Sequence, residues 1–346
     1  MFQSALPVPG RKPGGVDVYV DRLAQKLAMR GHDVQMISVS PAPAGARYVH
    51  RRLAGVSSDI GVRRLLKVPL LLNNLDTAGL DVLHLHGDDW FFVRRHVPTI
   101  RSFHGSALQE ARHATRFRRR AVQRIVFGLE LVSARLATKS YSVGPGWQRL
   151  YALSGTLDCG IEVGEAPSQQ ERSEVPSILF VGTWDGRKRG RLLHEMFLDE
   201  VRPRLPNAEL WMVSDKCAPA DGVKWFDGPS DQTLADLYDQ AWVLCLPSTY
   251  EGFGIPYLEA MAHGLPVVSS LNVGSRYVLG RSGAGLVVDD ADLGASILRL
   301  LSDGARRAQM GQSGHVRAQD FTWDRVLDAH EEAYAQTIAA WRGSST

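Results

Sequence analysis

The residues best suited to chemistry are two glutamates, Glu251 and Glu259, which enclose the segment Gly-Phe-Gly-Ile-Pro-Tyr-Leu. Backbone N–H groups at a helix start attract anions, and glycines let a phosphate approach the chain closely. Carboxylates instead accept hydrogen bonds from hydroxyl groups. The segment therefore predicts a ligand that carries both phosphate and sugar hydroxyls. The alternative is an ordinary strand-loop-helix unit with a surface glutamate at each end.

A short helix with a buried strand on each side must position these glutamates. Pro256 suits the first helical turn, where its missing N–H is not needed, and Gly264 suits the helix end. We therefore expect a helix over residues 257–263. The apolar runs at 242–246 and 265–268 are short enough to be buried parallel strands.

Helical and strand patterns alternate along the rest of the chain. In the first half, a helical pattern starts at Gly15 and ends at Gly31. Strand-like runs follow at 34–39, 81–86, 97–103 and 140–143, with a long helical pattern between the last two. In the second half, strands are expected at 178–181 and 209–213, and helices at 191–197 and 232–240. The alternation predicts an α/β protein with two doubly wound, Rossmann-like domains.

The domain boundaries follow from length and composition. A chain of 346 residues exceeds the usual size of a single core, which favours two domains. An acidic, polar stretch with Pro167 and Pro176 predicts a linker over 162–176, between a first domain at 1–161 and a second at 177–322. The last segment, 323–346, has the apolar spacing of an amphipathic helix.

Composition indicates a globular protein without a membrane span. Charged residues make up 22% and hydrophobic residues 44%, and no run approaches the roughly 18 apolar residues that a spanning helix needs. The chain start lacks a cationic stretch followed by an apolar one, so the expected location is the cytosol. The three cysteines have no CxxC spacing and predict neither disulfides nor zinc.

The positive charge is unevenly distributed. The net charge of +3 is too small to predict nucleic-acid binding, but six arginines and no acid lie between Arg112 and Arg124. An apolar-periodic pattern continues from there, as in a basic amphipathic helix. Two interpretations stay open: peripheral contact with an anionic membrane, which would place the protein at the inner membrane face, or a solvated helix face.

The chain as a whole resembles glycosyltransferase family 4, the retaining GT-B enzymes of the glycosyl transferases group 1. The most specific part is Pro-Ser-Thr-Tyr-Glu-Gly-Phe-Gly-Ile-Pro-Tyr-Leu-Glu-Ala-Met-Ala-His-Gly-Leu-Pro-Val-Val at 247–268. Supporting parts are Gly14-Gly15, Asp-Val-Leu-His-Leu-His at 81–86, the segment 98–105, and the segment 180–190. The resemblance implies two domains facing across a cleft, with a C-terminal helix that crosses back onto the first domain.

The resemblance also assigns roles at the donor end of the site. Glu251 would hold hydroxyls of the donor sugar, and Glu259 would accept hydrogen bonds from the ribose. The amides of Gly252, Phe253, Gly254 and Ile255 would contact the sugar and the diphosphate.

Two further positions match the family pattern in the first half. His104 matches the active-site histidine, which is expected near the reacting carbon and the 6-hydroxyl of the donor. Gly14 and Gly15 match the loop that lets the first helix start approach the diphosphate.

The basic residues that would bind phosphate depart from the family pattern. The family usually has Gly-Arg before Lys-Gly, whereas this chain has Gly182-Thr followed by Arg187, Lys188, Arg189 and a glycine. Spacing from Gly182 favours Lys188, adjacency to the glycine favours Arg189, and Arg187 could restore the second charge. Cations are required here because departure of the nucleotide leaves negative charge on the β-phosphate.

Acceptor and metal sites are less marked. His86, Asp88 and Trp90 follow an expected strand, and we expect them to bind the acceptor; Asp88 and its neighbour Asp89 would lie on the rim of the domain. The sequence Asp-Ala-Asp at 290–292 is interpreted as a helix cap, so no metal site and no cofactor are expected. The first strand, at 2–6, is short: it is either stunted or continues upstream of the given start.

Together these observations predict a metal-independent hexosyltransferase that uses a nucleotide-sugar donor. The acceptor would be a hydroxyl-bearing small molecule, glycan or lipid-linked molecule. Two alternatives stay open: a nucleotide-sugar epimerase of the same architecture, and a catalytically silent sugar-nucleotide-binding protein. The base, the sugar, the acceptor and the oligomeric state are not predicted.

Overall fold

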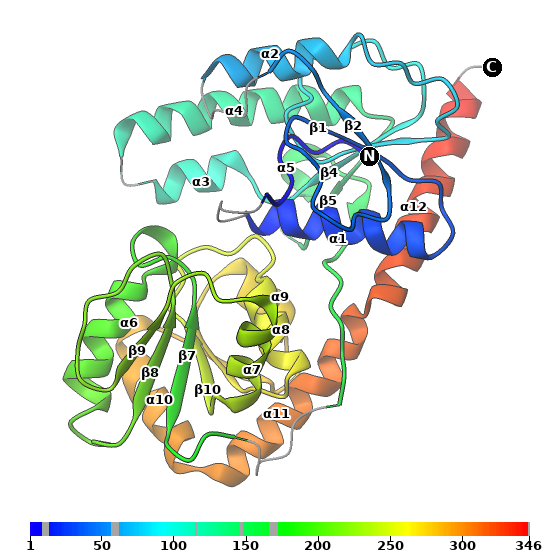
Figure 1. The fold of residues 1–346 in the computed structure, drawn as a ribbon. Helices are drawn as coiled ribbons and strands as arrows, with labels where there is room; N and C mark the ends of the chain where they lie inside the picture. Colours follow the sequence, from blue (N-terminus) through cyan, green and yellow to red (C-terminus); the bar gives the residue numbers. More distant parts are fainter. Residues whose placement is uncertain (9–13, 57–61, 115, 146–147, 166–171, 345–346) are drawn as a thin grey trace. The chain divides into compact units, whose positions relative to one another are not determined.

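The computed structural model describes residues 1–8, 14–56, 62–114, 116–145, 148–165 and 172–344. The chain forms two compact units (Figure 1). The first unit comprises Met1–Arg112, Arg116–Gly160 and Trp323–Thr346, and the second comprises His113–Thr115 and Ile161–Thr322. Each unit has its own parallel sheet.

The second unit alternates strands and helices. Its elements are β7 (Ser177–Val181), a 3-10 turn (Gly186–Lys188), α6 (Gly190–Met196) with a π-helical extension (Phe197–Val201), β8 (Glu209–Val213), β9 (Val223–Phe226), α7 (Asp231–Gln240), β10 (Val243–Leu246), α8 (Ile255–Ala262), β11 (Val267–Ser270), α9 (Val273–Leu279), β12 (Gly285–Val288), a 3-10 turn (Asp290–Asp292), α10 (Leu293–Ser302), α11 (Gly304–Ala318) and a 3-10 turn (Gln319–Phe321).

The strand order of this sheet is β12-β11-β10-β7-β8-β9, and every neighbouring pair is parallel. The first strand of the unit, β7, therefore lies beside the fourth, β10, and the order reverses between them. Open α/β sheets bind ligands outside the carboxyl ends of the strands at such a reversal. Helices cover both faces, with α6 and α10 on one side and α8 and α9 on the other (Figure 1).

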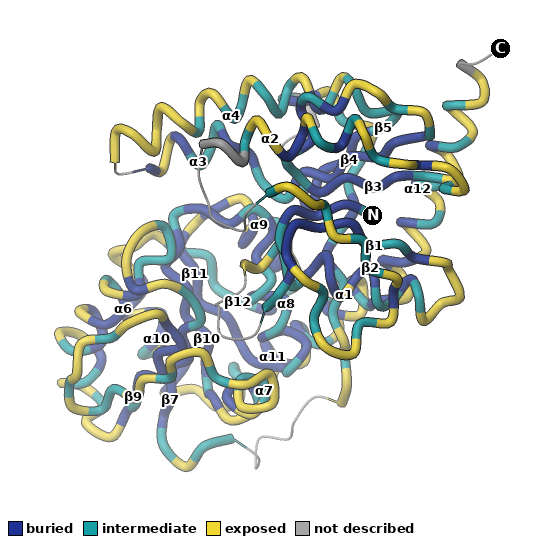
Figure 2. Tube along the Cα trace, turned by 45° about the horizontal axis from the view of Figure 1, so that its top comes forward, coloured by how far each residue is buried: buried dark blue, intermediate teal, exposed yellow. Residues whose placement is uncertain are grey.

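The predicted elements around the two glutamates are confirmed. The flanking strands are β10 and β11, which pair in parallel and are buried along their length (Figure 2). The helix between them, α8, begins two residues earlier than expected, at Ile255, with Pro256 in its first turn. It ends before Gly264, which has φ +59°.

The first unit follows the same plan. Its elements are α1 (Gly15–Met29), β1 (Gln35–Ser38), β2 (Val49–Arg52), α2 (Val62–Leu72), β3 (Leu83–Leu85), β4 (Thr99–Phe103), α3 (Ala107–His113), α4 (Phe117–Leu136), β5 (Lys139–Ser142), α5 (Gln148–Tyr151), β6 (Gly155–Thr156) and α12 (Trp323–Ser344).

The chain start joins two groups of strands in this unit. One group has the order β1-β2 and the other β3-β4-β5-β6. Phe2 forms parallel bridges to Ile37 in β1 and to Leu85 in β3, so the first residues lie between them. The expected strand at 2–6 is thus reduced to one bridged residue. If Phe2 is counted as the first strand, the strand order reverses between Phe2 and β3, as it does between β7 and β10 in the second unit.

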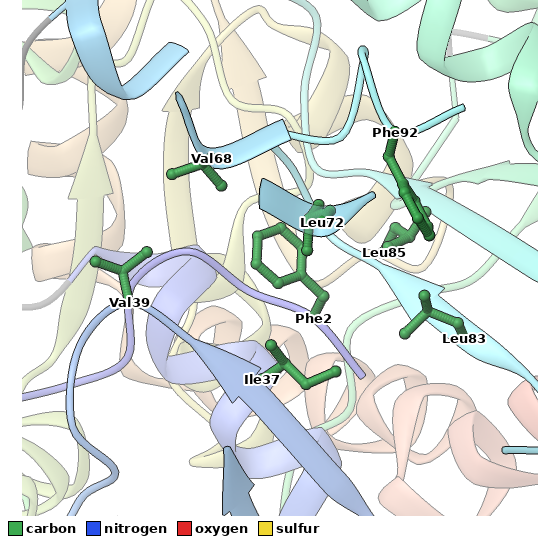
Figure 3. Packing of buried hydrophobic residues seen from close by; sticks show 8 residues of the cluster. All are labelled: Phe2, Ile37, Val39, Val68, Leu72, Leu83, Leu85 and Phe92. Atoms are coloured by element: carbon green, nitrogen blue, oxygen red, sulfur yellow. The ribbon is translucent and has the colours of Figure 1, made fainter. Parts of the chain in front are cut away.

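Phe2 also lies at the centre of the core (Figure 3). It packs, with no exposed surface, against residues of β1, β3 and α2. The buried cluster consists of Phe2, Ile37, Val39, Val68, Leu72, Leu83, Leu85 and Phe92. This core fixes the carboxyl ends of the strands from which the chemically active side chains of the unit project.

The long helical pattern expected between β4 and β5 is confirmed in α4, which spans 20 residues, and the shorter α3 precedes it. The helix α3 ends at His113 and α4 begins at Phe117, because Arg116 has an extended backbone with φ −92° and ψ 128°. The basic segment therefore spans the end of α3, the connection and the first turns of α4. Those first turns are exposed (Figure 2).

Apart from the short segment His113–Thr115, the chain passes between the units at two neighbouring points. Ile161 and Thr322, the end residues of the second unit, form a parallel bridge, and the Ile161 N–H donates to Phe321 O at 2.9 Å. Beyond this point α12 belongs to the first unit, where Arg30 bonds Asp328 and His32 contacts Glu331. None of the helices in the described ranges has the length and apolar character needed to cross a bilayer.

Truncation of the central core residue should destabilise the first unit. We expect Phe2→Ala to cost about 3–5 kcal/mol, because a fully buried ring leaves a cavity. The matched control is Phe117→Ala, which removes a ring that is 82% exposed and should change stability by about 0.5 kcal/mol or less. Urea unfolding followed by circular dichroism measures both; equal effects would contradict the assignment of Phe2 to the core.

Candidate active site

A buried ion cluster lies where the strand order of the second unit reverses. Glu251 follows β10 and is 4% exposed, and Lys188 follows β7. Lys188 Nζ lies 2.7 Å from Glu251 Oε1, and Arg187 Nη1 lies 3.1 Å from Oε2. Arg187 also donates to Tyr250 O at 2.8 Å. The structure thus brings together the acidic and basic residues that the sequence placed 63 positions apart or more.

Glu251 is ionised in this setting. Burial alone would raise its pKa, but the positive charges of Lys188 and Arg187 outweigh burial and hold the pKa below its usual value. A carboxylate held this way keeps its remaining lone pairs as acceptors for hydroxyl groups.

Glycines shape the loop that carries Glu251. Gly254 has φ +100°, a left-handed conformation that favours glycine, and a Cβ there would lie 2.4 Å from the Tyr257 ring. Behind the loop, a Cβ at Gly274 would lie 2.5 Å from Phe253 O and 2.8 Å from Glu251 Cβ. The first turn of α9 therefore supports the loop by direct backbone contact. Phe253 itself is 5% exposed and packs edge-on against Phe321.

The loop after β7 is fitted in a similar way. A Cβ at Gly182 would lie 2.8 Å from the Phe180 ring and 3.1 Å from Lys188 Cβ. Gly182 thus makes room for the stem of Lys188.

Arg189 serves a different purpose from its two neighbours. Its guanidinium binds both oxygens of Asp290, with Nη2 to Oδ1 at 2.7 Å, and contacts Ser270 and Pro247 O. Asp290 also accepts from Ser270 at 2.7 Å. The interpretation of 290–292 as a helix cap was wrong, since neither Asp289 nor Asp292 makes a side-chain cap bond and Asp290 pairs with Arg189 instead.

Glu259 lies on α8, one helical turn beyond the glycine loop. Its Oε2 accepts from the Tyr238 hydroxyl at 2.7 Å, and the Tyr238 ring stacks on His263. This contact fixes the carboxylate on the face of α8 toward α7. Gly252 lies in the loop before α8, and Ile255 is the first residue of α8.

The first unit contains a pocket of about 730 Å³ at the carboxyl ends of β3 and β4. His86, Asp88, Trp90 and His104 all line it, so the structure groups the four side chains that the sequence singled out in this half. Apolar side chains supply much of the remaining wall: Val16, Leu65, Phe103, Val122 and Val126.

His104 is held by aromatic neighbours. Its Nε2 lies 3.0 Å from His86 Nδ1, and the Tyr19 ring meets it edge-on with centroids 5.5 Å apart. Burial, and then the charges of Arg101 and His330, lower the pKa of His104 to about 3. The ring is therefore neutral at pH 7.

The two aspartates after β3 have different surroundings. Asp88 has φ +51°, a strained value for a residue with a side chain, and accepts from the Ser4 hydroxyl across the point where the strand order reverses. Asp89 is not on the rim, as expected, but fully buried, where it pairs with Arg95 at 3.1 Å and Arg101 at 2.9 Å. Trp90 lies beside them, 3% exposed, with its N–H donated to Leu65 O.

The glycine pair at the start of α1 differs from the other glycines. A Cβ at Gly14 would lie 3.0 Å from Asp17 Oδ2, whereas one at Gly15 would meet no described atom within 4 Å. The packing of the first unit therefore gives no reason for a glycine at Gly15.

Two residues, one of the pocket and one of the Glu251 loop, were missed from the sequence. Glu130 of α4 lines it, accepts from the Ala107 N–H and the Tyr151 hydroxyl, and has a raised pKa because of burial. Gly274, the support of the Glu251 loop, was missed as well. The sequence signals available for these two residues were a glutamate inside a basic amphipathic helix and a glycine in the first turn of α9.

Two family models match the chain. The model described as Glycosyltransferase Family 4 matches residues 13–145, and the model described as Glycosyl transferases group 1 matches residues 175–303. Together they cover most of the chain.

The chain is similar to curated mannosyltransferases. It is 32% identical to O-antigen chain mannosyltransferase B of Escherichia coli over 172 residues, 45% of this chain and 45% of that protein. The matched part thus spans less than half of that relative. It is 27% identical to phosphatidyl-myo-inositol mannosyltransferase of Propionibacterium freudenreichii subsp. shermanii, over 76% of this chain and 75% of that protein.

A solved structure has the same fold. Sucrose-phosphate synthase from Thermosynechococcus elongatus superposes with a TM-score of 0.78 at 23% identity, covering 94% of each chain. At this identity the likeness concerns the fold alone.

Filling the space behind the glutamate loop should displace it. We expect Gly274→Ala to cost about 1–3 kcal/mol, because its Cβ would overlap two backbone oxygens of the loop. Gly304→Ala is the matched control, since its nearest neighbour would be Arg307 Nη2 at 3.5 Å. Thermal unfolding of both variants tests this; a Gly274→Ala protein as stable as the Gly304→Ala protein would show that α9 does not support the loop.

Proposed function

Because this chain belongs to glycosyltransferase family 4 and has the GT-B fold, we propose that it transfers a hexose-type sugar from a nucleotide-diphosphate donor to an acceptor hydroxyl. The observation that carries the proposal is the cluster of Glu251 with Lys188 and Arg187, buried where the strand order reverses. That location is where open α/β sheets bind ligands. The cluster offers hydroxyl acceptors and phosphate-binding cations within one site.

In this proposal the second unit binds the donor. Lys188 has three N–H donors, so it can keep its bond to Glu251 while it donates to phosphate oxygens. Arg187 supplies the second charge; Arg189, paired with Asp290, does not. The free lone pairs of Glu251 accept from the sugar hydroxyls, the amides of residues 252–255 contact the sugar and diphosphate, and Glu259 accepts from the ribose.

The first unit supplies the acceptor pocket and His104. Asp88 and Glu130 can accept hydrogen bonds from acceptor hydroxyls, and the Trp90 ring and the apolar wall suit an acceptor with an apolar part. Gly14 and Gly15 at the start of α1 give a close approach for the diphosphate. Such a pocket supports an amphiphilic acceptor, for example a lipid-linked one.

The proposed chemistry retains the anomeric configuration and requires no metal. The bond between the anomeric carbon and the β-phosphate oxygen breaks, and Lys188 and Arg187 stabilise the charge left on the diphosphate. The acceptor oxygen bonds the same face of the sugar, and its proton passes to a phosphate oxygen. No carboxylate of the protein then has to act as a nucleophile.

The basic start of α4 supports contact with an anionic membrane, which would deliver a lipid-linked acceptor. Arginines 118–120 are exposed there beside Phe117, 82% exposed, and Ile125, 65% exposed. Cations and apolar rings on one exposed helix suit a surface of acidic lipid headgroups.

Donor binding should be detectable without knowledge of the acceptor. In a thermal-shift screen of UDP-, GDP-, ADP- and dTDP-sugars we expect one nucleotide class to raise the melting temperature. Glu251→Gln should weaken donor binding, since a hydrogen bond to a charged group is lost. About tenfold or more donor should then be needed for the same shift in melting temperature. No shift at millimolar donor would refute the proposal. Binding of a donor without hydrolysis, and without transfer to any acceptor, would favour a silent binding protein. Conversion of the donor sugar into another sugar would favour an epimerase.

A substitution at Gly15 tests donor binding without a loss of stability. Gly15→Ala should leave the melting temperature unchanged or slightly raised, because the Cβ meets no described atom and alanine is the better helix former. It should raise the KM for the donor at least several-fold if the diphosphate approaches α1 closely. Unchanged kinetics would exclude α1 from donor binding.

Membrane contact is tested by cosedimentation with vesicles. Binding to phosphatidylglycerol vesicles should exceed binding to phosphatidylcholine vesicles and fall with salt. Replacing Arg118 and Arg119 by glutamate should weaken it by about 1 kcal/mol or more per arginine. Arg281→Glu, an exposed site on the second unit, is the control; equal loss in both proteins would argue for the solvated-face interpretation.

A further inference from the structure

Three histidines form a continuous stack at the carboxyl ends of β3 and β4. The ring centroids of His84 and His86 lie 3.9 Å apart, and those of His86 and His104 lie 5.2 Å apart. We propose that His86 is a positioning residue that fixes His104 as the tautomer with its proton on Nδ1, so that His104 donates a hydrogen bond and does not act as a base. The consequence for catalysis rests on the proposed function; the tautomer does not.

The tautomer follows from where the hydrogen bonds of His86 can go. Its Nδ1 lies 3.0 Å from His104 Nε2, and one proton must lie between these two nitrogens. The other nitrogen of His86, Nε2, is buried and has no hydrogen-bond partner in the described part of the chain.

Two proton arrangements are then possible for neutral rings. If His104 Nε2–H donates to His86, the proton of His86 sits on its Nε2, as a buried donor without an acceptor. If His86 Nδ1–H donates to His104, the isolated Nε2 of His86 is only an unused lone pair. An unpaired buried N–H is the costlier defect, so the second arrangement is favoured. His104 then carries its own proton on Nδ1.

The surroundings keep both rings neutral. The groups that face them come from several elements: Arg101 from β4, His84 from β3, Tyr19 from α1 and His330 from α12. Tyr334, also of α12, contacts His84. Burial comes first among the causes that lower the pKa of His86 well below its usual value, followed by His84 and His104. A charged imidazolium pair would have to be buried beside Arg101, which is unfavourable.

The stack is anchored at its far end. His84 uses both of its nitrogens, with Nδ1 2.9 Å from the Tyr334 hydroxyl and Nε2 2.8 Å from Ser102 Oγ. This fixes the ring on which His86 stacks, and so the direction in which His86 Nδ1 points. The anchor includes α12, which gives that helix a part in positioning His104.

The consequence concerns the role of His104 in the pocket. Its Nε2 lone pair is occupied by His86, so the ring has no free acceptor with which to remove a proton from the acceptor hydroxyl. Its Nδ1–H is a donor, suited to an oxygen of the donor sugar or to oxygen that gains negative charge during transfer. This agrees with a mechanism in which the diphosphate takes the proton.

The tautomer can be measured directly. In protein with ¹⁵N-labelled histidine, long-range ¹H–¹⁵N correlation spectra at pH 7 should show His104 with a protonated Nδ1 and an unprotonated Nε2, assigned by loss of the signals in His104→Gln. His86→Phe keeps a ring in the stack and removes the donor, so the Nε2 of His104 should lose its hydrogen bond and its ¹⁵N signal should move toward that of a free lone pair. His86→Asn restores an N–H near the position of Nδ1 and should restore the signal of a hydrogen-bonded Nε2.

Kinetics supply a second readout. His86→Phe should lower kcat about fivefold to tenfold with little change in the donor KM, and His86→Asn should recover most of the loss. Tyr141→Phe is the control, because it deletes a buried hydroxyl of the neighbouring strand β5 that has no partner among the described residues. It should alter neither spectrum nor rate.

Clear results would overturn the proposal. Wild-type His104 with its proton on Nε2, with both nitrogens protonated, or with an Nε2 signal indifferent to His86→Phe would each refute it. The spectra need no substrate, so an Nδ1–H tautomer in a protein that transfers no sugar would refute the proposed function alone. An active transferase with an Nε2–H tautomer would refute the role of His86 alone.

Discussion

The second unit depends on one electrostatic arrangement, the burial of Glu251 against two cations. A single carboxylate with 4% exposure would lose most of its hydration, at a cost that favours its neutral form. Lys188 and Arg187 reverse that balance and keep the charge. They can do so because β7 and β10 are neighbours in the sheet although they are far apart in sequence. The sheet order is thus the condition for the ion cluster, and glycines at Gly182 and Gly274 allow the close approach that it needs.

The first unit also buries charged and polar side chains, but with different residues. Its strand order reverses at the chain start, and its polar groups also gather where the strands end. Here Asp89 forms ion pairs with both Arg95 and Arg101 in the interior, while the histidines beside them stay uncharged. One unit therefore presents paired charges and the other presents neutral donors with an apolar wall.

Much of this could be read from the sequence, where the physical signal was local. The strands flanking α8 were found because short apolar runs bounded by proline and glycine have few other solutions, and the motif around Glu251 named the family. The break between α3 and α4 was missed, since the helical pattern continues through Arg116 and only the backbone of that residue interrupts it. The partners of Asp290 and Asp89 were also missed. Their arginines come from other elements, Arg189 from the start of α6 and Arg101 from β4, and such pairings depend on tertiary packing that periodicity does not encode.

The bridge between Ile161 and Thr322 makes the segment 161–322, the main part of the second unit, a topological insertion: the polypeptide enters and leaves this segment through adjacent residues. A Cβ on Gly160 would come within 2.5 Å of the Trp323 ring, so the two connecting segments are also in contact on the first-unit side of the boundary. A segment with neighbouring ends can fold on its own, whereas the first unit is complete only once α12, which follows the insertion in the chain, has docked. During synthesis, the second unit would accordingly fold before the first unit is complete.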